Sequence, residues 1–170
     1  RRRHTRSDRD WSSDVCSSDL SNYPPEEVAL VLVDLQQRLL KYGGNYELDQ
    51  LPHVRLSLFD EDDVLDFGEA LSAGSVGLGK SNGPKAIFFI ADNYDAFEEA
   101  IKRERKLVEE IGRLARRRGT DGFHLILGGS SDILRGSDDI RRQVKSPRFG
   151  IAIQSVDAVQ NLNGRVPRSL

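Results

Sequence analysis

The chain is poor in cysteine and tryptophan, and its only examples, Cys16 and Trp11, lie within the first twenty residues. Residues 21–170 therefore offer no disulfide, no thiolate nucleophile and no zinc–thiolate site, a pattern that fits a reducing compartment. The longest apolar run, residues 28–33, is far shorter than the roughly 20 residues of a membrane span. The formal net charge of −2 gives no electrostatic reason to expect nucleic-acid binding.

Residues 1–20 differ from the rest of the chain. They have no hydrophobic periodicity and are rich in Ser, Asp and Arg. Back-translation of residues 2–7 and 10–20 matches, in one reading frame, the two constant blocks of a common short-read sequencing adapter. We therefore interpret residues 1–20 as a non-native, adapter-derived tail, predict that it is disordered, and exclude it from fold reasoning. The alternative is a natural basic tail or targeting peptide, although the lack of an apolar segment excludes a secretory signal.

What remains has an ordinary globular composition, with 38% hydrophobic and 31% charged residues over the whole chain. Apolar, β-rich runs predict strands at 28–33, 86–91, 123–127 and 149–153. Helices are predicted at 60–72, at 94–118 as one continuous helix, and at 137–145 with Ser137 as its cap. Weaker signals predict helical turns at 36–41 and 157–162, an extended piece at 55–58, and loops at 48–54 and 74–84. The alternation predicts an α/β fold with a mainly parallel sheet.

Polar residues follow three of the predicted strands. Asp34 and Asp92 each end an apolar run, and residues 128–131 form a Gly-Gly-Ser-Ser sequence after a third. Ligands of α/β proteins bind at the carboxyl ends of parallel strands, and in P-loop NTPases an aspartate there helps hold Mg²⁺. A glycine-rich loop can present N–H groups to an anion. The structural alternatives stay open, because an Asp at a strand end often caps its own loop and such glycines often form simple turns.

The histidines at 53 and 124 give no indication of a metal site. His53 and His124 are isolated from other His or Cys residues, so they are expected to be packed or loop histidines rather than metal ligands. The arginines of 113–118 are expected to form a solvated helix end, with a nucleic-acid contact as the alternative.

Five segments resemble, in order and spacing, the FtsK/SpoIIIE superfamily of P-loop ATPases, and most closely its type VII secretion ATPases of the EccC kind. The segments read VALVLVDLQQRLLKYGG, LDQLPHV, KAIFFIADNYDAF, RGTDGFHLILGGSSD and RFGIAIQ. The most specific parts are the Leu-Pro-His of 51–53 and the Gly-x-His of 122–124. The resemblance covers residues 21–170. It implies a partial RecA-like, three-layer P-loop NTPase domain that lacks its P-loop strand.

The resemblance also implies roles for individual residues. Asp92 matches the Walker B aspartate that holds Mg²⁺ with the nucleotide, and Ser130 stands where these enzymes usually carry a sensor glutamine. Asn93 replaces the glutamate that polarises the attacking water, and an amide cannot act as a base. Gln36 replaces a common lysine. The phosphate-binding G-x-x-x-x-G-K-[ST] sequence is absent, and residues 77–80 lack its spacing and context.

The implied function is that of a catalytically degenerate fragment of an ATP-binding translocase domain. ATP and Mg²⁺ are cofactors of the parent family, and the fragment is expected to bind neither. The implied partners are other ATPase domains of the same chain or ring, and a secretion substrate protein or DNA reached through the parent protein. The resemblance places that parent at the cytoplasmic side of the bacterial cell membrane, with no direct membrane contact by this fragment. Arg141, Arg142 and Arg148 are candidates to face a neighbouring protomer's nucleotide.

Two alternatives remain open. One is a non-enzymatic α/β docking module that binds a secretion substrate or a sister ATPase domain. The other is an unrelated flavodoxin-like domain. The family geometry predicts that strand 28–33 pairs with 86–91, and 86–91 with 123–127, while the missing strand would lie between 123–127 and 149–153. Such a gap would expose strand edges and apolar surface, so we predict marginal stability and aggregation for the fragment.

Overall fold

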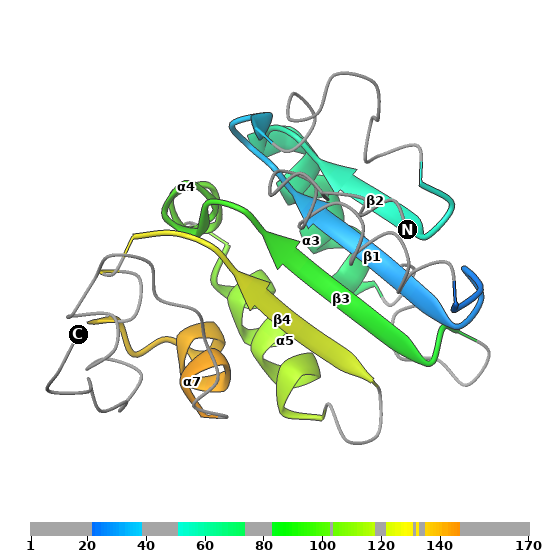
Figure 1. Ribbon diagram of the computed structural model, residues 1–170. Helices are drawn as coiled ribbons and strands as arrows, with labels where there is room; N and C mark the ends of the chain where they lie inside the picture. Colours follow the sequence, from blue (N-terminus) through cyan, green and yellow to red (C-terminus); the bar gives the residue numbers. More distant parts are fainter. Residues whose placement is uncertain are drawn as a thin grey trace, which may run out of the picture.

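The computed structural model describes residues 22–38, 51–73, 83–102, 104–117, 122–130, 132 and 135–146. These residues form a parallel sheet of four strands with helices packed against it (Figure 1). The strands are β1 (Val28–Val33), β2 (Val54–Leu58), β3 (Ala86–Ala91) and β4 (Phe123–Leu127). The helices are α3 (Glu61–Ser72), α4 (Tyr94–Ile101), α5 (Arg105–Arg116) and α7 (Asp139–Lys145). The predicted α/β class with a parallel sheet is confirmed. The predictions for 1–20, 149–153, 157–162 and most of 74–84 fall outside the described residues.

The strand order is β2-β1-β3-β4, and every neighbouring pair is parallel. Both predicted pairings are confirmed, since Val33 lies opposite Ala91 on β3, and Ala91 lies opposite Leu127 on β4. The extended piece predicted at 55–58 is part of a full strand, β2, which pairs with β1. Within the described sheet β3 is an interior strand, and its carboxyl end is flanked by the ends of β1 and β4.

The prediction of one helix over 94–118 is wrong, because the chain bends between α4 and α5. Ile101 and Leu107 are both almost fully buried in the core. Residues six positions apart point about 120° away from each other around a straight helix, so an interruption between them lets both side chains face the core directly. The helix is interrupted between Ile101 and Arg105, and Glu104, the N-cap of α5, makes no side-chain capping hydrogen bond. The periodicity of the sequence runs through the bend and therefore did not reveal it.

The described helices α3, α4 and α7 follow the capping rule that short polar side chains accept an amide hydrogen bond at the first turn. Asp60 accepts a hydrogen bond from the Asp63 amide at 2.8 Å, which places the predicted start of the 60–72 helix at its cap. The cap of α7 is Asp138, whose carboxylate accepts from the Arg141 amide at 3.0 Å. The prediction that Ser137 caps this helix is therefore wrong by one residue.

The helices cover one face of the sheet. Ile87, Phe89 and Ala91 of β3 point to this side and are fully buried against aromatic residues that include Phe67 of α3 and Phe97 of α4. Figure 1 shows α3 and α5 behind the sheet, as right-handed crossovers from β2 to β3 and from β3 to β4 require.

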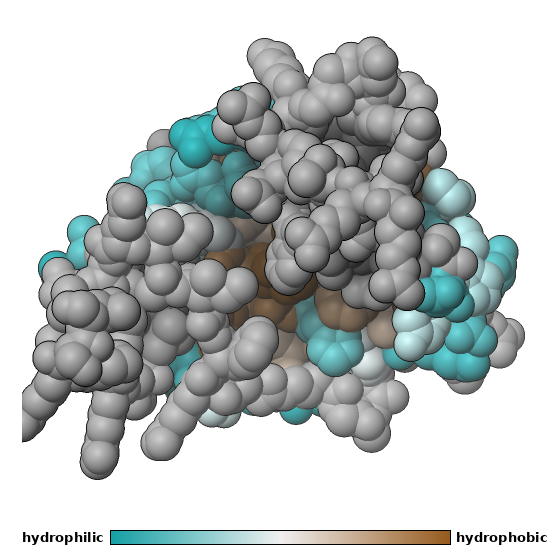
Figure 2. Space-filling view, viewed as in Figure 1, coloured by the Kyte–Doolittle hydropathy of each residue, from teal (hydrophilic) through white to brown (hydrophobic). Residues whose placement is uncertain are grey.

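The second face of the sheet is also apolar. It carries alternate residues of the strands, namely Val28, Leu30, Leu32, Phe88, Ile90 and Ile126. The β1 residues among them are buried, whereas Ile126 is 48% exposed. Figure 2 shows this apolar surface at the centre of the same view. An apolar second face is what a parallel sheet with layers on both sides presents.

Candidate functional site

The sequence-predicted site residues meet at one edge of the sheet. Asp34 follows β1 and Asp92 follows β3, and these strands are direct neighbours whose last residues pair. The chain leaves β1 toward β2 on one side and later crosses to β3 on the other. The strand order therefore reverses between β1 and β3, which is the position where open α/β sheets bind ligands.

Asp92 stands at this reversal point with its carboxylate unengaged by the described part of the chain. Its amide donates to the carbonyl oxygen of Val33 at 3.2 Å, which ties the turn to β1. The residue is only partly buried, and no hydrogen bond or ion pair joins its carboxylate to any described residue. A carboxylate in this state can accept a cation or a donor group from a ligand.

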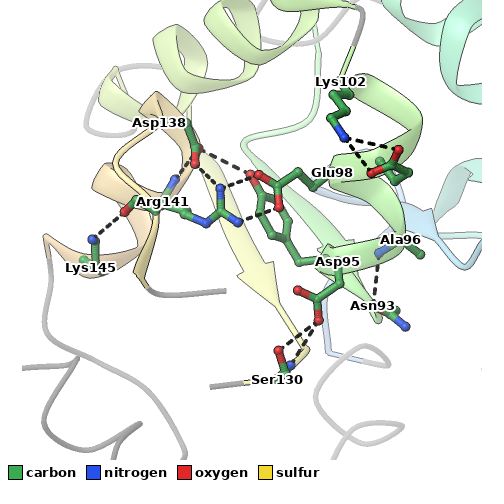
Figure 3. Close-up of polar contacts among 12 residues, drawn as sticks. Asn93, Asp95, Ala96, Glu98, Lys102, Ser130, Asp138, Arg141 and Lys145 are labelled. Carbon is green, nitrogen blue, oxygen red and sulfur yellow. Dashed lines mark hydrogen bonds and ion pairs between the residues drawn. The ribbon is translucent and has the colours of Figure 1, made fainter. Parts of the chain in front are cut away.

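The side chain of Asn93 is used to cap helix α4. Its side-chain oxygen accepts a hydrogen bond from the Ala96 amide at 3.2 Å and caps α4 (Figure 3). The extended backbone of this residue is typical of a helix cap. The side chain is therefore turned along the first turn of α4, and its amide has no basic character with which to activate water.

The turn between β3 and α4 is held closely by β4. The Gly128 amide donates to the Ala91 carbonyl at 2.8 Å, and the Tyr94 amide donates to the Gly128 carbonyl at 2.9 Å. A Cβ on Gly128 would lie 2.6 Å from the Asp92 carbonyl oxygen, closer than real Cβ contacts allow. Glycine is thus required at 128 because the two backbones touch.

Ser130 lies on the same edge but bonds to another residue. Its hydroxyl donates to the Asp95 carboxylate at 3.1 Å and its amide approaches the same oxygen at 3.4 Å (Figure 3). The Gly-Gly-Ser segment is thus fastened to the first turn of α4. The described contacts bring Ser130 to Asp95 rather than to Asp92.

Asp34 has the structural role of an aspartate that caps the loop after its own strand. It is 2% exposed, and its carboxylate accepts a hydrogen bond from the Arg38 amide at 2.8 Å. Gln37 in the same turn has a positive φ of 51°, a left-handed conformation that is uncommon outside glycine and occurs mainly in turns. Asp34 therefore closes its own loop.

The histidines lie where a structural role places them. His53 is buried and its Nε2 lies 2.7 Å from the Tyr23 carbonyl oxygen, while His124 stacks on Phe88 with ring centroids 4.9 Å apart. No group of three or more potential metal ligands occurs among the residues that the structure describes.

One polar cluster was not anticipated from the sequence. Arg141 is 8% exposed, and its guanidinium binds both carboxylate oxygens of Glu98, at 2.7 and 2.6 Å. It also binds Asp138 at 2.5 Å (Figure 3). The guanidinium carbon lies 5.1 Å from the centre of the Tyr94 ring. Only the tertiary structure brings these residues together, because Glu98 and Arg141 lie on different helices. We refer to Tyr94, Glu98, Asp138 and Arg141 as the arginine clamp.

The clamp changes the interpretation of the candidate trans-acting arginines. Arg141 is used within its own chain, and Arg142 pairs with Asp139 at 2.8 Å on an exposed surface. Arg148 lies outside the described residues.

Ionisation within the clamp follows from its geometry. Burial, together with the nearby charge of Asp138, holds the pKa of Tyr94 well above its ordinary value of 10.0. Burial acts to raise the pKa of Asp138, but hydrogen bonds from Arg141 outweigh it and leave this pKa below the ordinary range. The hydrogen bonds to Glu98 raise the pKa of Arg141 further. At neutral pH Tyr94 is therefore a neutral phenol, while Asp138 and Arg141 are charged.

A cavity of about 410 Å³ opens beside the clamp, between α4, α5 and α7. Its lining mixes acidic, basic and apolar side chains, among them Glu98, Lys102, Ile101, Val108 and Arg142. The charges of both signs give it no preference for an ion of one sign.

Comparisons with known proteins identify no family. No protein-family profile matches the chain, and neither do any curated protein or solved structure. No helix within the described ranges combines the length and hydropathy needed to cross a bilayer.

Proposed function

We propose that this chain is part of a catalytically degenerate, RecA-like nucleotide-binding domain of the FtsK/SpoIIIE kind. In this proposal Asp92 meets the Mg²⁺ of a bound nucleotide, and the parent protein uses the domain for regulation or docking rather than as a motor. The main support is the state of Asp92, a carboxylate without a described partner at the end of an interior strand, where the strand order reverses.

The neighbouring residue supports the degenerate half of the proposal. A hydrolytic P-loop enzyme needs a group that orients the attacking water. Asn93 follows Asp92 directly, and its side chain caps α4 instead. A domain of this design would bind nucleotide weakly or hydrolyse it slowly. ATP and Mg²⁺ are accordingly the proposed ligands of the parent domain, with residues upstream of 21 supplying the contacts to the phosphates.

The test uses the parent domain with the coding sequence upstream of residue 21 restored. Binding of a fluorescent ATP analogue is measured with Mg²⁺ and with EDTA, in the wild type, Asp92→Ala, and Asp62→Ala as an exposed control on α3. The proposal expects Mg²⁺-dependent binding that only Asp92→Ala weakens, with slow ATP turnover. Binding equally strong in Asp92→Ala would refute the role of Asp92. Turnover comparable to that of an intact translocase motor would refute the degenerate assignment.

The second candidate is the non-enzymatic docking module, and one observation favours it. The second face of the sheet presents Phe88, Ile90 and the 48%-exposed Ile126. Apolar patches of this kind often mark protein interaction sites. A sister ATPase domain of the parent chain, added in trans, would bind wild-type protein and lose affinity for Ile126→Asp. If Ile126→Asp binds as well as the wild type, this face is not the docking site.

A further inference from the structure

The short helix α7 is attached to the body of the protein mainly through polar contacts. It has seven residues, and isolated helices of this length do not persist in water. Ile140 is its one fully buried apolar residue. Asp139 of α7 also pairs with Arg116 of α5 at 3.3 Å. The arginine clamp adds a bidentate Arg141–Glu98 pair that joins α7 to α4. Such pairs fix geometry strongly because both N–H···O bonds must align.

Two glycines make room for this attachment. A Cβ on Gly136 would lie 2.6 Å from Arg141 Cδ and Nη1, so the guanidinium occupies the space that any side chain at 136 would need. A Cβ on Gly112 of α5 would lie 2.6 Å from Asp139 Cβ, so α5 and α7 approach each other at that point. Lys145 adds a bond to the Gly136 carbonyl at 2.9 Å. These close approaches fix the position of α7 against α5 and against the segment around Gly136.

Tyr94 connects the clamp to the turn that carries Asp92. It directly follows Asp92 and Asn93, and its amide donates to the carbonyl of Gly128, the residue that follows β4. Its ring is 1% exposed and lies under the guanidinium of Arg141, and its hydroxyl donates to Asp138 at 3.3 Å. The main chain of Tyr94 is thus bonded at the edge of the sheet, while its side chain contacts Arg141 and Asp138, which attach α7.

We infer that Arg141 is a positioning residue for the Asp92 turn, and that α7 is a coupling arm whose attachment is transmitted to that turn through Tyr94. When α7 is attached, the Tyr94 ring is held in place and the Tyr94 amide keeps its hydrogen bond to the Gly128 carbonyl. With the clamp broken, the ring loses two of its neighbours and the turn gains freedom. A partner that pulls on the exposed side of α7 would then change the position of the Asp92 carboxylate. The consequence for nucleotide affinity depends on the proposed function, whereas the coupling itself does not.

Hydrogen–deuterium exchange on the full 170-residue chain tests the coupling without any ligand. The variants are Arg141→Met, the milder Glu98→Gln, and Arg142→Met as the control from the same helix, where the side chain is 64% exposed. The measured quantity is the exchange rate in peptides that span the Tyr94 amide and the Gly128 amide. The inference expects exchange about tenfold faster in both clamp variants and unchanged rates in Arg142→Met.

Faster exchange confined to α7 itself, with the turn peptides unchanged, would overturn the inference. If Arg141→Met fails to fold, Glu98→Gln decides alone, because it removes one charge and keeps the shape of the side chain. A second measurement follows Mg-ATP affinity of the parent domain in the same variants. If the wild-type domain binds no nucleotide, the proposed function fails while the exchange result still decides the coupling. If it binds, we expect Arg141→Met to lower the affinity about tenfold.

Discussion

Two aspartates end two neighbouring strands, and the fold uses them in opposite ways. Asp34 is 2% exposed and closes the loop after β1 through a hydrogen bond from the Arg38 amide. Asp92 after β3 is partly exposed, and its carboxylate has no partner in the described ranges. The two sequences look alike, because each is an apolar run followed by aspartate.

The difference arises from the burial of the strands. All six residues of β1 are buried, so its terminal carboxylate is carried inward and needs a donor to offset the loss of water. Burial alternates along β3, and although its last residue Ala91 is fully buried, Asp92 after it is only partly buried, so its carboxylate loses less contact with water. A carboxylate that the fold does not need is the one available to a ligand. The following predictions test this contrast, from the largest expected effect to the smallest.

Gly128→Ala should break the turn that presents Asp92. The new Cβ would lie 2.6 Å from the Asp92 carbonyl oxygen, and a backbone atom cannot move aside easily. We expect a loss of about 3 kcal/mol in the free energy of unfolding, measured by urea denaturation. Gly68→Ala is the control, since its Cβ would meet only the flexible Leu107 side chain at 3.3 Å. An unchanged stability for Gly128→Ala would mean that the two backbones do not touch.

Asp34→Ala should destabilise the protein, and Asp92→Ala should not. Removing the buried Asp34 carboxylate deprives the Arg38 amide of its acceptor in a partly buried hydrogen bond, at a cost of about 2 kcal/mol. Removing the Asp92 carboxylate breaks no described contact and should change stability by less than about 0.5 kcal/mol. Both values come from the same denaturant titration. Equal losses for the two variants would remove the contrast between the aspartates.

Asn93→Ala should lower stability by about 1 kcal/mol, because it removes the cap of α4. Asn93→Asp should retain most of the wild-type value, since aspartate caps equally well. Helix content and urea denaturation report the effect. Asp60→Ala, which removes the cap of α3, is a matched comparison and should cost a similar amount. If Asn93→Ala is neutral, the side chain is free for another role.

The free energy of unfolding should decrease as the pH rises above the ordinary pKa of tyrosine, because of Tyr94. Burial and the charge of Asp138 raise the pKa of Tyr94 in the folded protein above the unfolded value of 10.0. Its contribution is therefore fully present below pH 10.0 and is lost as the pH rises beyond that value. Urea denaturation across this range measures the slope. Tyr94→Phe should flatten it, at a cost of about 0.5–1 kcal/mol at neutral pH for the lost bond to Asp138. An identical slope in Tyr94→Phe would assign the effect to other groups.

The sequence predicted the layout of the sheet better than the helices around it. Apolar runs identified β1, β3 and β4 with their bounds, because buried parallel strands are continuous apolar segments. The break between α4 and α5 was missed, since the apolar spacing continues through it. The strand β2 was predicted only as an extended piece at 55–58, because only its last residue, Leu58, is buried and its pairing with β1 depends on tertiary contacts.

The site was predicted only in part. The pattern of strand plus Asp located both Asp34 and Asp92 but could not distinguish them, since burial of the strand decides their roles. The arginine clamp could not be foreseen, because Glu98 and Arg141 meet only after α7 folds back on α4. A weak signal existed in Gly136, whose lack of a side chain makes room for the guanidinium.

The most direct test of the central claim is calorimetric binding of Mg-ATP to the parent domain, compared between Asp92→Ala and Asp34→Asn. The account predicts that Asp92→Ala lowers the affinity by more than about tenfold and leaves folding stability unchanged. Asp34→Asn should lower stability and leave the affinity within about threefold of the wild type. Loss of affinity in Asp34→Asn with normal binding by Asp92→Ala would contradict the account.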